Sequence, residues 1–330
     1  MLWILSPDVA KIDFSQDKTS CDALDNILSA VFSGYHILHI ASADIKRLKK
    51  QSHNFSNKSK AVITKMSGQG YQKLPHIKYK AIISKLCKTP VKKTNIEWEI
   101  PLDSFSNHAA ANRTIILAED YIDAALYDIA ANHYMIKNKL KGFSVSSRPE
   151  AGGGSRTKAV LEIIISRGEE TCICVTDSDK YSPSSSVSAT ARDCSNAASK
   201  SRWPVAHVAT ISRELENILP RKFVNEIIGP QQQTEWQSIE SLAEKSSPLF
   251  PYIDIKKGTY MHWVFKLPKA SSCRTFWDNE LNNGTVKSAL NLDCLDNQAC
   301  DLRDPDKCNC VISQGMGTKV AEKVLDYLKN

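Results

Sequence analysis

Long apolar runs are absent from the 330-residue chain, and no stretch approaches the roughly 20 apolar residues of a membrane-spanning helix. The first residues, MLWILSPDVAKID, lack a basic n-region and reach Asp8 after only a few apolar residues, so we expect no secretory signal. Together these absences predict a cytoplasmic protein with no membrane contact. Ten cysteines in that reducing compartment are expected to be core thiols or metal ligands instead of disulfides.

Acidic residues are missing from one long segment. Between Lys46 and Lys93 there are 14 Lys and Arg residues and no Asp or Glu, although the net charge of the whole chain is only +7. Such a segment repels itself unless an anionic partner lies against it, and a nucleic-acid backbone is the most common such partner. Aromatic and imidazole rings that could stack on bases lie among the lysines: Phe55, Tyr71, Tyr79, His53 and His76.

The second half of this basic segment supplies our candidates for nucleic-acid binding. They are Lys73, Lys78, Lys80, Lys85, Lys88, Lys92 and Lys93. The alternative interpretation is a solvated lysine-rich face without a nucleic-acid partner.

Residues 1–105, which include the basic segment 46–93, are predicted to form a small α/β module. LWILSP and YHILHIAS are short apolar runs typical of strands, and CDALDNILSAVFSG between them has helical spacing and ends at Gly34. This strand–helix–strand order favours an α/β arrangement. Residues 101–111 are expected to be a linker, and the serine-rich stretch 182–201 a flexible loop.

Residues 112–240 have the pattern of a second α/β domain with a parallel sheet and covering helices. Strands alternate with helices of 10–18 residues, which is typical of parallel sheets. The predicted strands are RTIILAE, GFSVSS, TCICVTDSD and WPVAHVAT. A glycine-rich turn, GGGSRTK, opens one of the helices but lacks the spacing of a Walker phosphate loop.

Carboxylates follow three of these strands, at the edge where parallel sheets collect functional residues. Glu119 ends the first strand, and a helix that begins near residue 119 would place Asp123 on the same face. Asp177 and Asp179 follow the third strand, and two residues in extended chain share one side. Glu214 and Glu216 follow the fourth strand at the start of a helix, where about 200° separates them, so only one can face a shared site. We prefer Glu216.

Crowded carboxylates repel one another, and a hard divalent cation relieves this repulsion. Oxygen ligands favour Mg²⁺ or Mn²⁺, so the sequence predicts one or two such ions. For each acid taken singly, the ordinary alternative is favourable electrostatics at a helix N-terminus. Nearby cations could neutralise a phosphoryl transition state or could simply be surface charges: Lys158, Lys180 and Arg213.

These motifs resemble a TOPRIM domain. The resemblance is carried by Glu119-x-x-x-Asp123, GGGSRTK and Asp177-x-Asp179, and SRELENIL is similar to the Arg-Glu-hydrophobic-Glu-Asn motif of OLD-like TOPRIM nucleases from phage-defence systems. It covers about residues 112–225. It implies a TOPRIM-like fold and a Mg²⁺-dependent endonuclease whose site is built from Glu119, Asp123, Asp177, Asp179 and one of Glu214 and Glu216.

The resemblance further implies a toxic effector of a bacterial anti-phage defence system. OLD nucleases commonly work with an ATPase, so a separate ATPase or sensor protein is the expected partner, and a homo-oligomer is a further expectation. The target could be DNA or RNA, including tRNA. The alternatives are a non-catalytic nucleic-acid-binding subunit of a defence or repair complex, and a primase- or topoisomerase-like enzyme, which would need modules that this chain lacks. The N-terminal module resembles a degenerate PIN-like domain, with Asp8 and Asp44 as remnants.

The C-terminal region, residues 241–330, is rich in cysteine. Four thiols lie within 17 polar, turn-rich residues, and structural Zn²⁺ needs four thiolates brought together by turns. Reduced free thiols and redox chemistry are the alternatives. The predicted zinc ligands are Cys294, Cys300, Cys308 and Cys310, with Cys273 as a replacement for one of them.

Overall fold

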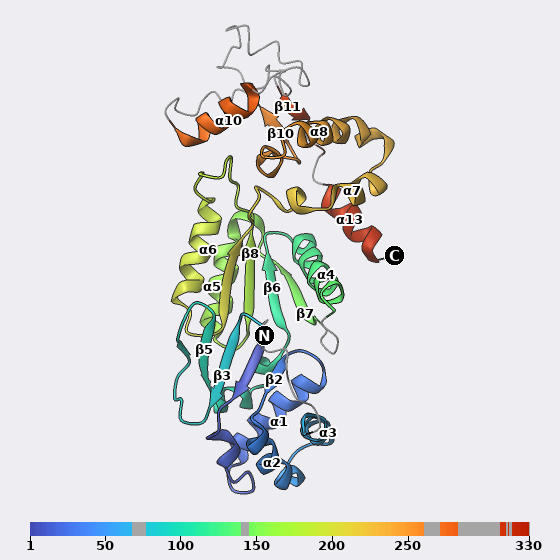
Figure 1. The fold of residues 1–330 in the computed structure, drawn as a ribbon. Helices are drawn as coiled ribbons and strands as arrows, with labels where there is room; N and C mark the ends of the chain where they lie inside the picture. Colours follow the sequence, from blue (N-terminus) through green and yellow to red (C-terminus); the bar gives the residue numbers. More distant parts are fainter. Residues whose placement is uncertain are drawn as a thin grey trace. The chain divides into compact units, whose positions relative to one another are not determined.

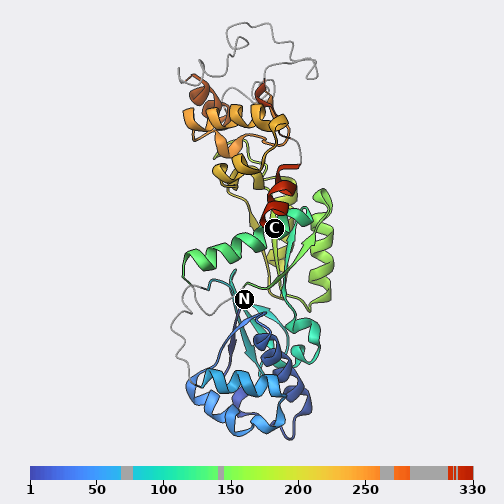
Figure 2. The same cartoon turned by 90° about the vertical axis from the view of Figure 1, so that its right-hand side faces the viewer.

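The computed structural model describes residues 1–67, 77–139, 145–260, 271–282, 311–314, 316 and 319–329. The chain forms two compact units (Figures 1 and 2). The first consists of Met1–Val175 and Asp193–Val208, and the second of Thr176–Arg192 and Ala209–Asn330. The predicted boundary near 105 falls inside the first unit, and the second unit begins before residue 240, since it takes in Thr176–Arg192 and the chain from Ala209 onward.

The N-terminal part of the first unit is built on a mixed five-stranded sheet of order β2-β1-β3-β5-β4. All its pairings are parallel except that of β4 with β5. In β2, β3 and β5 buried side chains mostly alternate with half-buried ones, as expected where one face meets a core. They are β1 (Leu2–Leu5), β2 (Ile37–His39), β3 (Lys80–Ser84), β4 (Val91–Lys92) and β5 (Glu97–Pro101).

Three helices accompany this sheet. The first begins where the Asp17 carboxylate accepts the Ser20 N–H, and it ends before Gly34, whose φ of +78° suits glycine. Its apolar face, with Leu24, Ile27 and Leu28, is fully buried. The helices are α1 (Lys18–Phe32), α2 (Ser42–Lys50) and α3 (Asn57–Met66), with single 3₁₀ turns η1 (Val9–Lys11) and η2 (Ser52–Asn54). The predicted strand–helix–strand order is therefore present.

The predicted linker at 101–111 is wrong. This segment forms two 3₁₀ helices, η4 (Leu102–Ser106) and η5 (His108–Ala111), because its apolar residues enter the core. Phe105 is fully buried between Trp3 and Trp203, with ring centroids 5.2 and 6.3 Å away. Trp203 directly precedes the last strand of the second sheet, so one core joins both sheets of the first unit.

The second sheet has four strands in the order β7-β6-β8-β9. The pairings of β6 with β7 and with β8 are parallel, as the sequence predicts. The strand expected at GFSVSS lies further along the chain, and it contains Pro149, which an edge strand tolerates. The strands are β6 (Thr114–Ala118), β7 (Ser147–Ala151), β8 (Cys172–Thr176) and β9 (Val205–Ala209).

Helices cover both faces of this sheet (Figure 1). Ile115 and Leu117 of β6 pack with α5 (Thr157–Arg167) and α6 (Ala189–Lys200), whereas Ile116 and Ala118 pack with α4 (Tyr121–Lys137) on the other face. The glycine-rich turn after β7 leads through η6 (Gly154–Arg156) into α5. A Cβ on Gly152 would lie 2.3 Å from the Thr157 hydroxyl oxygen, so no larger residue fits there without movement.

The predicted serine-rich loop is in part a helix. Residues 189–200 form α6 (Ala189–Lys200), so only the stretch before it is irregular. Ala191, Cys194 and Ala198 recur at helical spacing and are buried. The high serine content of this stretch suggested a loop, although its alanines favour a helix and its apolar residues form a buried stripe.

The second unit contains helices and one small sheet. Strand β10 (Gly258–Tyr260) pairs antiparallel with β11 (Val311–Gln314). A core of Val224, Trp236, Ile239 and Ile255 is closed by Met316 and Val320. The helices are η7 (Leu215–Ile218), α7 (Arg221–Ile227), η8 (Pro230–Gln232), α8 (Gln233–Lys245), η9 (Phe250–Tyr252), α10 (Ser272–Asn282) and α13 (Lys319–Lys329). Across the described parts of both units, no helix has the length and hydropathy needed to cross a bilayer.

Candidate functional site

The predicted acids are divided between the two compact units. Glu119 and Asp123 belong to the first unit. Asp177, Asp179, Glu214 and Glu216 belong to the second unit, and each group is described within its own unit.

Glu119 precedes α4 and is not part of it. The helix begins at Tyr121 because the Asp120 side chain accepts the Ile122 N–H as its N-cap, so the expected shared helical face of Glu119 and Asp123 does not form. The Glu119 carbonyl oxygen instead accepts the N–H groups of Gly153 and Gly154 at 2.9 and 3.0 Å. Asp123 is buried in the first turn of α4.

The segment after β8 does not stay extended. Ser178 is fully buried, and its polar groups are satisfied there. Its N–H donates to the Thr210 hydroxyl at 2.9 Å, and its own hydroxyl donates to the Ser212 carbonyl at 2.5 Å. Asp179 has a φ of +51°, a left-handed conformation that Asp tolerates better than most residues. This φ departs from the extended chain on which the expectation of a shared side for Asp177 and Asp179 was based.

The segment after β9 forms the short 3₁₀ helix η7 instead of the expected longer helix, and Pro220 follows it. Glu214 is the N-cap: its side chain accepts the Asn217 N–H, and the Asn217 side-chain oxygen accepts the Glu214 N–H at 2.9 Å. The Asn217 amide also donates to the carbonyls of Phe250 and Ile253 at 2.8 and 3.0 Å. Asn217 thereby fixes η7 to the chain around η9.

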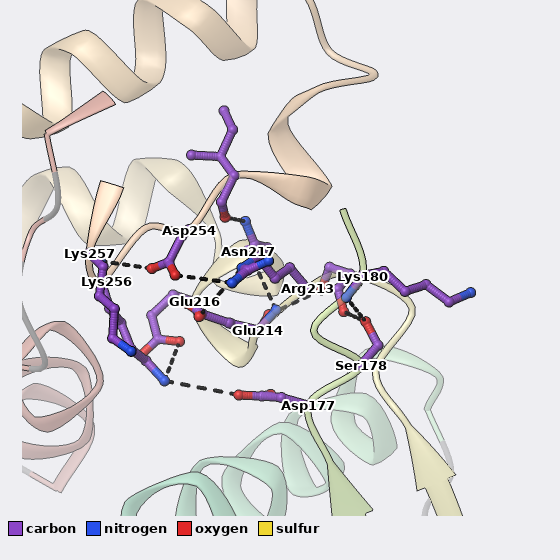
Figure 3. Close-up of polar contacts among 12 residues, drawn as sticks. Asp177, Ser178, Lys180, Arg213, Glu214, Glu216, Asn217, Asp254, Lys256 and Lys257 are labelled. Carbon is purple, nitrogen blue, oxygen red and sulfur yellow. Dashed lines mark hydrogen bonds and ion pairs between the residues drawn. The ribbon is translucent and has the colours of Figure 1, made fainter. Parts of the chain in front are cut away.

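Lys256 brings two of the predicted acids together (Figure 3). Its Nζ lies 3.2 Å from Glu216 Oε2 and 4.0 Å from Asp177 Oδ2. Asp177 is also oriented by the Leu215 N–H, which donates to its Oδ1 at 3.1 Å. Glu216 is only 2% exposed, so Lys256 and Glu216 form a largely buried ion pair.

Arg213 is held by side chains that surround it within the second unit. Its Nη2 lies 3.2 Å from Asp254 Oδ2, its Nε lies 3.7 Å from Glu214 Oε1, and its guanidinium stacks 4.4 Å from the centre of the Tyr181 ring. Asp254 in turn accepts the Lys257 N–H at 2.7 Å. Arg213 is buried, which favours a role in orienting the acids over a direct contact with a large ligand.

The two other predicted cations lie elsewhere. The side chain of Lys180 points away from Asp177 and Glu216 (Figure 3). Lys158, in the first turn of α5 in the first unit, is half-buried, with Glu162 at 3.8 Å and Asp193 at 4.0 Å.

Burial raises the pKa of Glu214 to about 7, and the neighbouring negative charges of Asp254 and Glu216 add to this effect. Lys256 and Arg213 oppose the increase without cancelling it. The ionised Glu214 therefore costs folding free energy. This cost is absent below the ordinary pKa of 4.5, grows as the pH rises toward 7, and is fully present above 7.

Glu214→Gln should therefore stabilise the protein at high pH and have little effect at low pH. The amide keeps the oxygen that caps η7, but it carries no charge. In EDTA, we expect the variant to gain up to about 2–3 kcal/mol relative to wild type between about pH 5 and 8, since one pKa unit corresponds to about 1.4 kcal/mol. Denaturant unfolding at both pH values measures this gain. The exposed Glu244 gives a matched control, Glu244→Gln, and an equal effect of Glu214→Gln at both pH values would contradict the expectation.

The donor chemistry around Glu216 suits a hard divalent cation. Glu216 Oε1 and Glu214 Oε2 are buried and have no hydrogen-bond partner among the described residues, although such oxygens are normally satisfied. Within the same described residues, no three His, Cys, Asp or Glu side chains group as a metal site. Mg²⁺ commonly needs only one or two protein carboxylates, with water and substrate phosphate completing its shell, and Asp177 and Glu216 meet that need.

Lys256 and Asp254 were not predicted, because only the cysteines of residues 241–330 were considered as candidates in that region. The signal was nevertheless present in YIDIK, where the charged Asp254 and Lys256 alternate with the buried Ile253 and Ile255. Charged residues framed by buried Ile253 and Ile255 are unusual enough to mark a buried polar cluster.

Several lysines of the basic segment form contacts within the first unit. Lys85 Nζ lies 2.8 Å from Asp103 and 3.1 Å from Asp17, and Lys93 Nζ lies 2.7 Å from Glu99. Lys92 donates to the Ala198 carbonyl at 3.2 Å and lies over the Trp98 ring. Lys78 and Lys88 are exposed and Lys80 is half-buried, whereas Lys73, Tyr71 and His76 lie outside the described residues.

Asp8 and Asp44, which the sequence suggested as remnants of a PIN-like site, have structural contacts. Asp8 accepts the N–H groups of Lys85 and Leu86 at 2.7 and 3.0 Å, which fixes the turn after β3. Asp44 pairs with Arg47 within α2 at 2.9 Å. The predicted zinc ligands Cys294, Cys300, Cys308 and Cys310 lie outside the described residues, and Cys273 is half-buried as a free thiol.

Comparison with known proteins adds no relative to these observations: no family model, no curated protein and no solved structure matches the chain.

Proposed function

We propose that this protein is a metal-dependent nuclease that hydrolyses phosphodiester bonds in DNA or RNA. The observation that carries the proposal is the environment of Glu216. Its carboxylate is buried after β9, its Oε1 has no hydrogen-bond donor in the described part of the chain, and Lys256 joins it to Asp177 after β8. A folded protein tolerates such an under-satisfied carboxylate where a ligand completes it.

In this proposal, Asp177 and Glu216 hold one Mg²⁺ or Mn²⁺ ion. The bound ion would polarise the scissile phosphate and lower the pKa of a bound water. The Leu215 N–H orients Asp177, while Asn217 and Arg213 keep η7 and Asp254 in place. Lys256 lies between the two carboxylates, and its positive charge limits their mutual repulsion.

The remaining predicted ligands rest on sequence. Glu119, Asp123 and Asp179 are the further candidates for metal binding that the sequence offers, and Glu119 could instead act as general base. The sequence alone also supports four further parts of the proposal. They are the TOPRIM-like fold, the role as toxic effector of an anti-phage system, the separate ATPase or sensor partner, and the structural Zn²⁺. The α/β architecture with a sheet covered on both faces supports it at a coarser level.

A second candidate is a non-catalytic subunit that binds nucleic acid. One observation favours it: the Lys256 ammonium already lies against both Asp177 and Glu216, so the carboxylates have a cation without any metal. In that case the acids would serve folding alone.

Incubation of the purified chain with plasmid DNA, single-stranded DNA and tRNA tests the proposal. We expect cleavage of at least one substrate in Mg²⁺ or Mn²⁺ and none in EDTA, because the two carboxylates cannot activate water alone. Intact substrates in both metals, together with retained nucleic-acid binding, would favour the non-catalytic subunit.

A further inference from the structure

Helices α2 and α3 form a continuous pair in the first unit, joined only by the short turn η2 (Figure 1). Their apolar residues face inward, with Ile45 and Leu48 buried on α2 and Val62, Ile63 and Met66 buried on α3. The outward faces are therefore fixed by packing, and the residues on them are held toward solvent.

The outward faces are strongly basic. On α2, Lys46, Lys49 and Lys50 have the i, i+3, i+4 spacing of one helical face, and all three are exposed. On α3, Lys58 and Lys65 are seven residues apart, which also places them on one face, and both are exposed. Residues 42–67 hold seven Lys and Arg and one carboxylate, Asp44.

The carboxylates near this helix pair do not neutralise its lysines. Asp44 is buried and pairs with Arg47, and Asp25 of α1 accepts the Ser56 N–H at 2.8 Å. Among the residues that the structure describes, none of Lys46, Lys49, Lys50, Lys58 and Lys65 has an ion pair.

The lysines near β3 and β4 provide a contrast. Lys85 and Lys93 have carboxylate partners, and Lys92 is occupied by a carbonyl oxygen and the Trp98 ring. Besides the exposed Lys78 and Lys88, the exposed lysines without an ion pair in the described part of the basic segment therefore lie on α2 and α3. Repulsion among these charges is relieved when a polyanion lies against them.

We infer that the outward face of α2 and α3 binds the sugar–phosphate backbone of nucleic acid. This inference rests on the proposed function, for which it supplies the surface that holds the substrate. Lysines act on phosphate as point charges and carry no base-reading geometry, so the face binds without sequence preference. A regular row of phosphates matches lysines that repeat along a helix, whereas a single small anion would engage only one or two of them.

The test is a salt titration of binding in EDTA, where cleavage cannot interfere. The variant Lys46→Gln, Lys50→Gln, Lys58→Gln, Lys65→Gln removes two same-face charges from each helix. The matched control Lys137→Gln, Arg167→Gln, Lys200→Gln, Arg202→Gln removes the same charge from exposed positions elsewhere in the first unit. Fluorescence anisotropy with a short DNA duplex and a short single-stranded RNA, from about 50 to 200 mM KCl, gives the log–log slope for each protein.

We expect the helix-pair variant to flatten the slope by about 3–4 for the duplex, or about 3 for the single strand, and to weaken binding at least about tenfold at the lowest salt. The control should keep the wild-type slope. The probe that wild type binds more tightly, and whose affinity falls more in the helix-pair variant, shows whether the duplex or the single strand is the preferred source of the phosphates. Equal slopes for variant and control, with unchanged circular dichroism melting, would overturn the inference. Retained salt-dependent binding without cleavage in metal would reject the nuclease while leaving this binding face intact.

Discussion

Asp177→Asn is expected to abolish metal-dependent cleavage while the protein remains folded. The amide keeps the volume of the side chain and an oxygen that can accept the Leu215 N–H. It removes the negative charge that faces Lys256 and, in the proposed function, the metal ion. Loss of an outer-shell partner of a metal typically costs about 10–100-fold, so loss of a direct ligand should cost more. Glu119→Ala is expected to have the same effect on cleavage.

The measurement is the initial rate of cleavage in saturating Mg²⁺, with thermal melting as a check on folding. Asp278→Asn provides a matched control in the same unit, because Asp278 is a half-exposed carboxylate that pairs with Arg274 away from the site. Full activity of Asp177→Asn and Glu119→Ala at unchanged melting temperature would exclude the proposed metal ligands. If Asp177→Asn loses activity because it unfolds, the measurement would be repeated with Asp177→Glu, which preserves the charge.

Lys256→Met is expected to destabilise the second unit strongly in EDTA. Methionine preserves much of the aliphatic stem but leaves the buried Glu216 without its cation. Removal of one partner from a buried ion pair commonly costs about 3–5 kcal/mol, and the partial exposure of Lys256 places our expectation near the lower value. A divalent cation that binds beside Glu216 should recover much of this loss, since a ligand that binds only the folded state stabilises it.

Thermal or denaturant unfolding with and without millimolar Mg²⁺ measures both effects. Lys257→Met is the matched control, because Lys257 is the adjacent lysine, is exposed, and contacts Asp254 through its backbone N–H alone. We expect the control to be close to wild type. If Mg²⁺ stabilises Lys256→Met no more than wild type, the carboxylates serve as partners of Lys256 and not as a metal site.

The parallel sheet of residues 112–210 was predictable because its strands are short apolar runs bounded by polar residues. In β6 four consecutive apolar residues are buried, and in β8 the buried Cys172 and Cys174 alternate with half-buried neighbours. The strand β7 was misplaced because Arg148 and Glu150 interrupt its apolar pattern. Their charges form an ion pair with each other at the edge of the sheet, and Arg148 also pairs with Glu170, which no local pattern reveals.

The position of each acid along the chain was predictable, but the side on which it lies was not. The Asp120 cap places Glu119 before α4, and Asp179 has a left-handed φ where the pattern predicts extended chain. Both are features of the local backbone conformation, which the spacing of residue types does not specify. Lys256 could not be assigned to Glu216 because their contact is 40 residues apart in sequence and depends on how η7 packs against η9.

The lysines show a similar limit. Composition predicts that residues 46–93 are basic, but it cannot state which charges remain available. Asp17 and Asp103 neutralise Lys85 from outside the segment, and Glu99 neutralises Lys93. Only the folded structure separates these lysines from those of α2 and α3.

The second unit is assembled from two separate stretches of chain, and this has a consequence for how the protein is made. During synthesis, β8 can join its sheet early, but the following residues 176–192 belong to a unit whose other residues begin at Ala209. Those 17 residues, including Asp177 and Asp179, must wait for the ribosome to deliver η7 and the chain beyond it, since domains form as their residues emerge. In the proposed function, a nascent chain that has not yet reached Lys256 lacks the cation that joins Asp177 to Glu216, so we expect it to be inactive on nucleic acid.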